Sequence, residues 1–323
     1  MARHGKAARK SVIAVTGATG AQGGGLVQAI LGDADGPFAV RAITRNPRSA
    51  GAQALQRQGA AVVAADLDDP LSLERAFHGA WGAFCVTNFW EHLSPDRELT
   101  QARNMADAAR AAGLAHVLWS TLEDTRQWIP LADERMPTLM GRYKVPHFDA
   151  KGEANRCFRD CGVPTTYLLT SFYWDNFIHF GMGPQRTPDG TLAIVLPMGE
   201  EKLPGIASED IGRCAYGVFR KAEEYRDKTV GIAGEHLTGA EMARAIGHAI
   251  GKPVAYNAVT PAAYRGFGFP GADDLGNMFQ FNRDFSADFC KARSVSESRA
   301  LNPSLQTFAA WLSANGSRIP LPD

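Results

Sequence analysis

Glycines recur at Gly17, Gly20 and Gly23, between an apolar β-branched run at residues 12–16 and a segment of helical period at residues 22–31. A strand that passes into a helix through glycines at this spacing is typical of the first strand–turn–helix unit of a parallel α/β sheet. The glycines allow a sharp turn, close approach of backbone N–H groups to an anion, and close packing of helix on strand. Because the N-terminus of a helix carries partial positive charge, the turn predicts a binding site for a pyrophosphate.

The same alternation of apolar runs and helical segments continues beyond the turn. Strands are expected at residues 12–16, 39–44, 61–65, 83–87, 116–120 and 165–169. Helices are expected between them, at residues 22–31, 50–58, 71–77, 95–112 and 147–161. Helices that alternate with β-branched strands are typical of a parallel sheet covered on both faces. The chain is therefore predicted to be an α/β protein with a Rossmann-type, doubly wound parallel sheet of six strands.

After residue 169 the regular alternation weakens. Helices are expected at residues 208–221, 238–250 and 304–315, and further apolar runs lie at residues 229–233 and 254–256. We predict a dinucleotide-binding Rossmann domain over residues 11–170. Residues 171–323 are predicted to form a smaller, partly interleaved α/β region for a substrate or partner. The basic residues 1–10 are expected to form a disordered tail.

Charge and cysteine content restrict the partners and the compartment. Lys and Arg number 34 and Asp and Glu number 34, so no overall positive field favours nucleic acid or an anionic membrane. The five cysteines include no Cys-x-x-Cys pair of the kind that binds zinc, and no metal site is predicted. No stretch approaches the roughly 20 apolar residues that span a bilayer. A cytoplasmic protein with reduced, buried thiols is expected.

The residues after the second predicted strand bear on which dinucleotide binds. Sites that prefer NAD place a carboxylate there for the ribose 2′-OH, whereas this chain continues as Thr44-Arg45-Asn46-Pro47-Arg48. The Arg45 guanidinium can form a bidentate, charge-assisted pair with a 2′-phosphate, and Arg48 can add a second contact. The sequence therefore favours NADP(H) as the cofactor. The alternative is that both arginines form a solvated surface pair.

Polar residues also follow the third and fourth predicted strands, at the edge of the sheet where ligands bind. Asp66 and Leu67 follow the third strand. Asp66 is placed either to accept a hydrogen bond from the adenine amino group or to cap the helix that follows. Thr87, Asn88 and Phe89 follow the fourth strand and are expected to line the cofactor trough.

Several segments together resemble a known family. They are Thr16-Gly17-Ala18-Thr19-Gly20-Ala21-Gln22-Gly23, Thr44-Arg45-Asn46-Pro47-Arg48, Thr87-Asn88-Phe89-Trp90-Glu91, His147-Phe148-Asp149-Ala150-Lys151-Gly152-Glu153, Tyr173-Trp174-Asp175-Asn176 and Gly268-Phe269-Pro270-Gly271-Ala272-Asp273-Asp274-Leu275. In these segments the chain resembles the NmrA-like proteins, in particular the HSCARG-type group, an atypical branch of the short-chain dehydrogenase/reductase superfamily. The late Gly-Phe-Pro-Gly segment is far more particular to that group than the glycine turn.

The resemblance implies cofactor contacts in five places along the chain. They are Gly17, Ala18, Thr19, Gly20, Ala21 and Gln22; Arg45, Asn46, Pro47, Arg48 and Ser49; Thr87, Asn88 and Phe89; Lys151; and Tyr173, Trp174, Asp175 and Asn176. Two positions depart from the family pattern. Thr100 stands where relatives carry a basic residue on the helix after the fourth strand, which is expected to weaken the grip on the cofactor. Ser49 stands in place of a further Lys.

The residue four positions before Lys151 decides which function the sequence favours. Typical short-chain reductases have a Tyr there that delivers a proton to the carbonyl, with the Lys holding the nicotinamide ribose. This chain has His147 instead. The NmrA-like pattern therefore favours a redox-sensing regulator that binds NADP(H) and a protein partner. The alternative is an NADPH-dependent reductase of a small carbonyl or quinone that uses His147, Lys151 and Ser120.

Aromatic residues gather in two segments that flank the expected cofactor trough. They either shape an apolar pocket beside the nicotinamide or seal the interface between the two regions, and sealing is the commoner role of such residues. They are Trp90, Phe172, Tyr173, Trp174 and Phe177.

Overall fold

The computed structural model describes residues 10–322. The predicted disordered tail therefore lies, except for Lys10, outside the described residues. Within the described part, no helix is long and apolar enough to cross a membrane.

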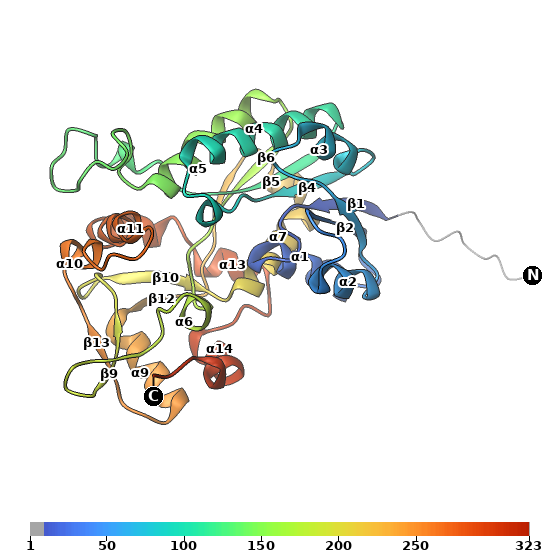
Figure 1. The fold of residues 1–323 in the computed structure, drawn as a ribbon. Coiled ribbons are helices and arrows are strands. Elements are labelled where there is room, and N and C mark those ends of the chain that lie inside the picture. Colours follow the sequence, from blue (N-terminus) through green and yellow to red (C-terminus); the bar gives the residue numbers. More distant parts are fainter. Residues whose placement is uncertain (1–9, 323) are drawn as a thin grey trace, which may run out of the picture.

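A seven-stranded parallel sheet forms the centre of the larger part of the molecule (Figure 1). Its strands are β1 (Ser11–Val15), β2 (Phe38–Thr44), β3 (Ala61–Ala64), β4 (Gly82–Cys85), β5 (His116–Thr121), β6 (Thr165–Leu169) and β11 (Thr229–Gly231). They lie in the order β11-β6-β5-β4-β1-β2-β3, and every neighbouring pair is parallel. This order reverses direction at β1, which confirms the predicted Rossmann-type doubly wound sheet.

The seventh strand corrects the prediction of six. The apolar run at residues 229–233, expected in the smaller region, supplies β11, which pairs with β6 from Thr229 opposite Tyr167 to Gly231 opposite Leu169. Apolar, β-branched content identifies a strand but does not say which sheet it joins. Residues beyond 170 therefore complete the sheet that was predicted to end at β6.

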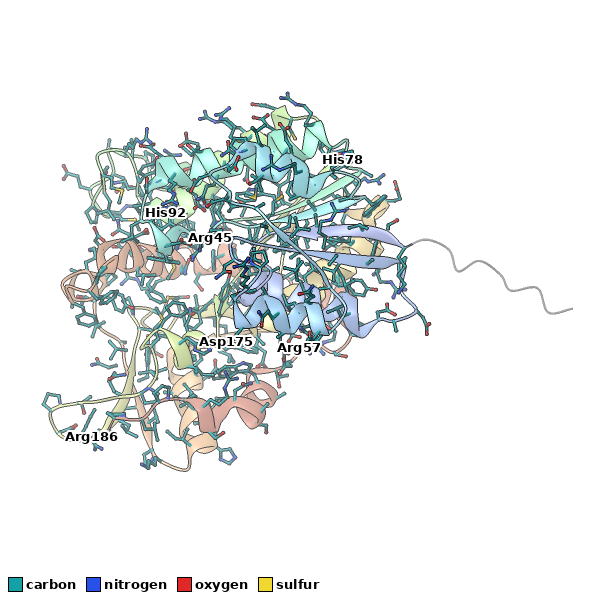
Figure 2. All side chains as sticks on the ribbon, turned by 45° about the vertical axis from the view of Figure 1, so that its right-hand side comes forward. Arg45, Arg57, His78, His92, Asp175 and Arg186 are labelled. Atoms are coloured by element: carbon teal, nitrogen blue, oxygen red, sulfur yellow. The ribbon has the colours of Figure 1, made fainter. Side chains whose placement is uncertain are left out.

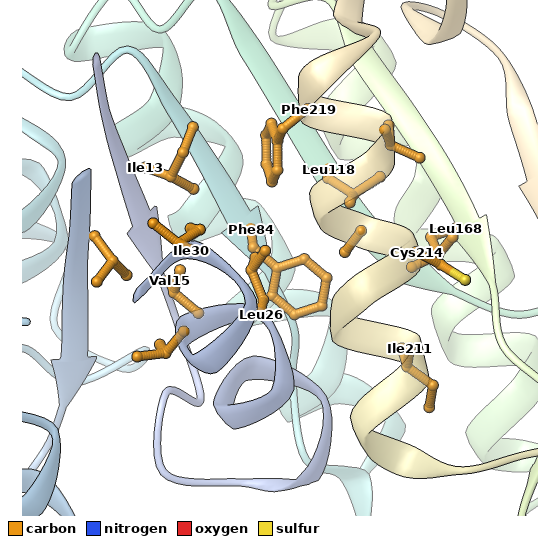
Figure 3. Packing of buried hydrophobic residues seen from close by; sticks show 14 of the residues in the cluster. Ile13, Val15, Leu26, Ile30, Phe84, Leu118, Leu168, Ile211, Cys214 and Phe219 are labelled. Atoms are coloured by element: carbon orange, nitrogen blue, oxygen red, sulfur yellow. The ribbon is translucent and has the colours of Figure 1, made fainter. Parts of the chain in front are cut away.

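Helices cover both faces of this sheet, as Figure 1 shows. One face carries α1 (Ala21–Gly32), α2 (Ala50–Arg57), α7 (Ser208–Arg220) and α13 (Val295–Leu301). The other face carries α3 (Pro70–Phe77), α4 (Pro95–Ala111) and α5 (Pro146–Asp160). Leu26, Ile211 and Phe219 from the first set of helices pack on Ile13 and Leu118 of the strands (Figure 3). Burial on both faces explains why these strands read as continuous apolar runs.

The helices α1 and α7 approach each other unusually closely because glycines face each other across their contact. A Cβ added at Gly212 of α7 would lie 2.0 Å from the backbone nitrogen of Leu26 and 2.1 Å from the carbonyl carbon of Gly25 in α1. No side chain fits in this space. The helix that carries the glycine turn is therefore supported directly by backbone from the second half of the chain.

The smaller region holds two three-stranded sheets and a second core. The sheets are formed by β12 (Glu235–Thr238), β10 (Lys202–Ile206) and β7 (Phe172–Tyr173), and by β13 (Val254–Asn257), β9 (Leu192–Val195) and β8 (Gln185–Arg186). The helices of this region are α6 (Asn176–His179), α9 (Gly239–Ile250), α10 (Pro261–Arg265), α11 (Ala272–Asp284), α12 (Ser286–Lys291) and α14 (Phe308–Asn315). The short helix α8 (Ala222–Tyr225) belongs to the main sheet, where Tyr225 lies in the core. Trp174, Phe279 and Trp311 lie in the second core.

The last helix begins later than the sequence predicts. The expected start at residue 304 follows an Asn-Pro pair, whereas α14 begins at Phe308. Its N-cap is Thr307, whose hydroxyl accepts a hydrogen bond from Ala310 N at 3.2 Å. The helix starts after Thr307 because the hydroxyl of this residue satisfies a backbone N–H of the first turn. Pro303 favours a turn but offers no such acceptor.

Candidate functional site

The glycine turn between β1 and α1 has the conformation that an anion site needs. Gly17 has a φ of +59°, which residues with a Cβ rarely adopt. A Cβ at Gly23 would lie 2.4 Å from the Gly17 carbonyl oxygen, so only glycine fits there. Gly20 is the N-cap of α1, and among the described residues no side chain caps this end and no acidic residue lies in the first turn. The first N–H groups of α1 can therefore receive a phosphate.

Arg45, directly after β2, is engaged by a carboxylate from another loop. Figure 2 shows it at the margin between the main sheet and the smaller region. Its Nη1 donates to Oε1 of Glu91, and its Nη2 donates to Oε2 at 3.2 Å. Glu91 ends the short helix η1 (Phe89–Glu91). The hydrogen bond to Glu91 raises the pKa of Arg45. The acid that is missing from the end of β2 thus comes from the loop after β4.

The residues after Arg45 shape their own loop. Asn46 Oδ1 accepts a hydrogen bond from Arg48 N at 3.0 Å. Ser49 is the N-cap of α2 and accepts from Ala52 N at 3.3 Å. The departure of Ser49 from the family pattern therefore has a local structural role, because a Lys could not cap the helix.

Asp66 does not cap the helix that follows it, which corrects one of the two predicted roles. The N-cap of α3 is Asp69, whose Oδ1 accepts from Leu71 N at 3.1 Å and from Ser72 N at 3.2 Å. Asp66 Oδ1 instead accepts from Asp68 N at 3.0 Å. The adenine contact of Asp66 stays a prediction.

Helix α4 borders the carboxyl edge of the sheet, close to the residues that follow β3. The Leu67 carbonyl accepts a hydrogen bond from Asn104 Nδ2 at 2.8 Å. This bond ties Leu67, one of the residues that follow the third predicted strand, to α4. Thr100 is exposed on α4, and its hydroxyl donates to the Asp96 carbonyl at 2.9 Å. Its side chain is bound to its own helix and brings no charge to the edge.

Ser120 contacts the cofactor turn through a short chain of hydrogen bonds. Its Oγ donates to Gln22 Oε1 at 2.7 Å, and Gln22 Nε2 donates to the Tyr173 hydroxyl at 2.6 Å. Burial raises the pKa of Tyr173. The structure thus brings together three predicted site residues from β5, α1 and β7, and it ties the Ser120 hydroxyl to Gln22.

Lys151 forms a buried ion pair with a residue that the sequence does not single out. Its Nζ lies 2.6 Å from Oε1 of Glu98 and donates to Thr87 Oγ1 at 2.5 Å. The Glu98 side chain is 0% exposed and that of Lys151 10%. His92 Nε2 lies 3.6 Å from the other Glu98 oxygen, and burial lowers the pKa of His92. The predicted contacts Lys151 and Thr87 therefore meet around one carboxylate.

The start of α5, the helix that carries Lys151, is fixed by a buried acid in its first turn. Pro146 is the first residue of the helix. Asp149 accepts hydrogen bonds from Lys144 N at 2.7 Å, Val145 N at 3.1 Å and Thr125 N at 2.7 Å. Burial raises the pKa of Asp149. These bonds satisfy backbone groups at the helix start and tie the preceding loop to it.

His147 is held by a second buried carboxylate. Its Nδ1 lies 2.7 Å from Oδ1 of Asp274, and its backbone N donates to Oδ2 at 3.2 Å. The two side chains are 6% and 5% exposed. With Nδ1–H donated to Asp274, Nε2 is the ring nitrogen that can exchange a proton. Asp274 lies in the first turn of α11, within the late Gly-Phe-Pro-Gly segment of the resemblance, but the sequence does not show that it reaches His147.

Aromatic rings cover His147. The Trp90 ring centroid lies 4.8 Å from that of His147, and the Phe89 centroid lies 5.9 Å from it. Trp90 is 39% exposed, and a Cβ added at Gly271 would lie 2.9 Å from its ring. Trp90, a residue of η1, therefore presents apolar surface beside the imidazole and packs against Gly271, just before α11.

The residues after β6 face two ways. Trp174 and Phe177 are buried in the second core, where the Trp174 ring centroid lies 5.2 Å from that of Phe308. For these two residues the structure shows the packing role. Asp175 Oδ2 accepts from the first backbone N–H of α7 at 2.9 Å, and Asn176 begins α6. The Trp174 side chain thus packs inside the smaller region, whereas Asp175 borders α7.

Comparisons with known proteins agree with this architecture. The model of the NmrA-like family matches residues 9–312. The chain is 27% identical over 336 residues to the NmrA-like family domain-containing oxidoreductase ptmS of Penicillium ochrochloron, a match that covers 94% of this chain and 97% of that protein. It is 30% identical over 252 residues to the oxidoreductase notA' of Aspergillus versicolor, with 72% of this chain and 67% of that protein covered.

Solved structures show the same fold. NmrA, a negative transcriptional regulator, in complex with NADP superposes with a TM-score of 0.76 at 21% identity, over 94% of each chain. The Citrobacter sp. triphenylmethane reductase complexed with NADP(H) gives a TM-score of 0.73 at 22% identity, over 94% of this chain and 99% of that one. The family model spans nearly the whole sequence, and the chain therefore belongs to the NmrA-like family.

Proposed function

We propose that the protein binds NADP(H) at the carboxyl edge of the seven-stranded sheet. The turn of Gly17, Gly20 and Gly23 fits a pyrophosphate, because its N–H groups lie at an uncapped helix start where no Cβ intrudes. Arg45 fits a 2′-phosphate through its two terminal nitrogens. NmrA with NADP, NmrA with NAD and triphenylmethane reductase with NADP(H) support a nicotinamide dinucleotide at this place. Lys151 borders the same edge.

The proposed activity is NADPH-dependent reduction of a small apolar carbonyl or quinone. The observation that carries it is the 2.7 Å contact between His147 Nδ1 and Asp274 Oδ1. The reduced cofactor, when bound, supplies a hydride to the carbon of the substrate. Because Asp274 accepts from Nδ1–H, a protonated His147 delivers the proton from Nε2 to the substrate oxygen, in place of the Tyr of typical relatives. Trp90 offers this substrate a flat apolar surface.

Turnover tests the proposal directly. The full chain is mixed with NADPH and a panel of quinones and aldehydes, and the loss of NADPH absorbance is followed. We expect turnover with at least one panel member, and its loss in His147→Ala. The matched control is His179→Ala, which removes an exposed histidine at the end of α6. Turnover that survives in His147→Ala would contradict the assigned proton donor.

Cofactor preference tests the assignment of Arg45. Arg45→Ala should abolish the preference for NADPH over NADH, because the contact with the 2′-phosphate disappears while the glycine turn remains. Arg48→Ala is the matched control and should have a smaller effect. An unchanged preference in Arg45→Ala would show that another residue reads the 2′-phosphate.

A redox-sensing regulator is the second candidate. The observation that favours it is the position of Lys151, whose ammonium is tied to the buried Glu98 and to Thr87. A lysine held in this way does not serve a reacting group as it does in typical reductases. NmrA is a negative transcriptional regulator. Tight NADPH binding without turnover of any panel member would support this candidate over the reductase.

A further inference from the structure

We propose that Glu91 competes with the 2′-phosphate for Arg45 and thereby sets how strongly the site prefers NADP(H) over NAD(H). This inference rests on the proposed function, because it takes Arg45 as the residue that reads the 2′-phosphate. It assigns a specificity role to a residue that belongs to neither the glycine turn nor the strand end where such acids usually stand.

The geometry makes the competition direct. Both terminal nitrogens of Arg45 are bonded to Glu91, one to each carboxylate oxygen. A phosphate would use the same fork of N–H groups, because bidentate recognition needs both. Arg45 cannot offer its fork to Glu91 and to a phosphate at once. A dinucleotide with a 2′-phosphate must therefore displace Glu91, whereas one with a 2′-OH can leave the pair intact.

The backbone of η1 keeps Glu91 in this position. Phe89, the first residue of η1, is 2% exposed and its carbonyl accepts a hydrogen bond from Leu93 N at 2.7 Å. Trp90 packs on His147. Phe89 and Trp90 fix the backbone before Glu91, and Leu93 fixes the backbone after it. Because the backbone is held on both sides, the Glu91 carboxylate is expected to leave Arg45 by rotation of its side chain. The rotated carboxylate stays attached to the same backbone, so its charge is expected still to act on a phosphate bound at Arg45.

The same carboxylate favours the unphosphorylated ribose. In sites that prefer NAD, an acid accepts a hydrogen bond from the ribose 2′-OH. Glu91, held beside Arg45, offers that acceptor from a different loop. In this pair Arg45 favours a ribose with a 2′-phosphate, and Glu91 favours a ribose with a 2′-OH. The preference of the site for NADP(H) over NAD(H) is therefore predicted to be moderate.

The size of the effect follows from two contributions. Breaking an exposed ion pair changes an equilibrium by up to about fivefold, and repulsion between two charges about 4 Å apart in water adds roughly another fivefold. We expect Glu91→Gln to tighten NADP⁺ binding by up to about 25-fold in total. NAD⁺ binding should be unchanged or a few-fold weaker, because the acceptor for its 2′-OH is diminished.

Calorimetry on the full chain with NADP⁺ and with NAD⁺ tests this inference. The variants are Glu91→Gln, Arg45→Ala and the double variant. In the Arg45→Ala background the gain from Glu91→Gln should fall to about fivefold, because the competition for Arg45 is gone and only the direct repulsion of the phosphate remains. The matched control is Asp96→Asn. Asp96 lies in the first turn of α4, shortly after η1, and its exposed carboxylate pairs with Arg142. This substitution should leave the ratio of the two dissociation constants unchanged.

The outcomes separate the inference from the proposed function. If the unaltered protein gives no heat with either dinucleotide, the proposed function fails and this inference with it. If it binds both but Glu91→Gln shifts neither, or shifts both equally, only the role of Glu91 is refuted. A gain that is as large without Arg45 as with it would show that Glu91 acts by repulsion of the phosphate alone and would overturn the competition.

Discussion

Replacing Glu98 by Gln should destabilise the fold strongly, because it leaves the Lys151 ammonium buried without its counter-charge. Glu98 is 0% exposed, Lys151 is 10% exposed, and the two charged atoms lie 2.6 Å apart. Removing one partner of such a pair typically costs about 3 to 5 kcal/mol, because the remaining charge has lost both water and its partner. Since the Lys151 side chain keeps slight exposure, we expect the lower value, about 3 kcal/mol.

A double-variant cycle shows whether this cost comes from the pair itself. Lys151→Met strands Glu98 and should cost a similar amount. The double variant should cost less than either single one, because buried ion pairs can be replaced by uncharged groups at little net cost. The free energy of unfolding is measured in urea by tryptophan fluorescence. As a control, Asp107→Asn breaks the exposed pair with Arg110 and should cost less than about 1 kcal/mol. Additive costs, or single costs below that of the control, would refute the reasoning.

Three further changes have defined outcomes. Gly23→Ala should abolish the heat of NADP⁺ binding in calorimetry, because the added Cβ would lie 2.4 Å from a carbonyl oxygen of the turn. Gly24→Ala is the control and should still bind NADP⁺, because its Cβ would lie 3.5 Å from the nearest neighbouring atom. Equal binding by the two variants would contradict the role of the glycine turn in holding the pyrophosphate. Burial lowers the pKa of His116 from 6.5 to about 4, so the unfolded chain takes up this proton first and the free energy of unfolding should fall by up to about 3 kcal/mol between pH 6.5 and 4. His116→Asn should reduce that fall in urea titrations, and an undiminished fall would exclude His116 as its source. Asp274→Asn should lower kcat roughly a hundredfold with little change in KM, and a full kcat would mean that His147 needs no positioning.

Local patterns in the sequence predict the parts of the fold that local chemistry determines. The predicted strand at residues 165–169 coincides with β6, and the predicted helix at residues 95–112 coincides with α4 to within one residue. The glycine spacing predicts the turn because Gly17 has a positive φ and a Cβ at Gly23 would collide with the Gly17 carbonyl oxygen in the same turn. In such segments the residues that interact lie within the same few positions that form the sequence pattern.

Contacts between distant segments escape the same reasoning. Asp274 reaches His147 across 127 positions, and Glu91 reaches Arg45 across 46. An acidic residue near a helix start looks the same in sequence whether it caps the helix, faces water or holds a histidine. The strand β11 shows the same limit, since its apolar run does not reveal that β6 is its neighbour.

The pairing of β11 with β6 and the packing of α7 on the main sheet restrict how the molecule can move. Two bodies joined by one linker can swing apart on a single hinge, but here the chain runs back and forth between the main sheet and the smaller region several times. A rigid opening would have to bend every crossing segment at the same moment. The distance between the glycine turn and the smaller region should therefore change little, and exchange of the proposed dinucleotide should be timed by the rotation of exposed side chains such as Trp90 and Glu91.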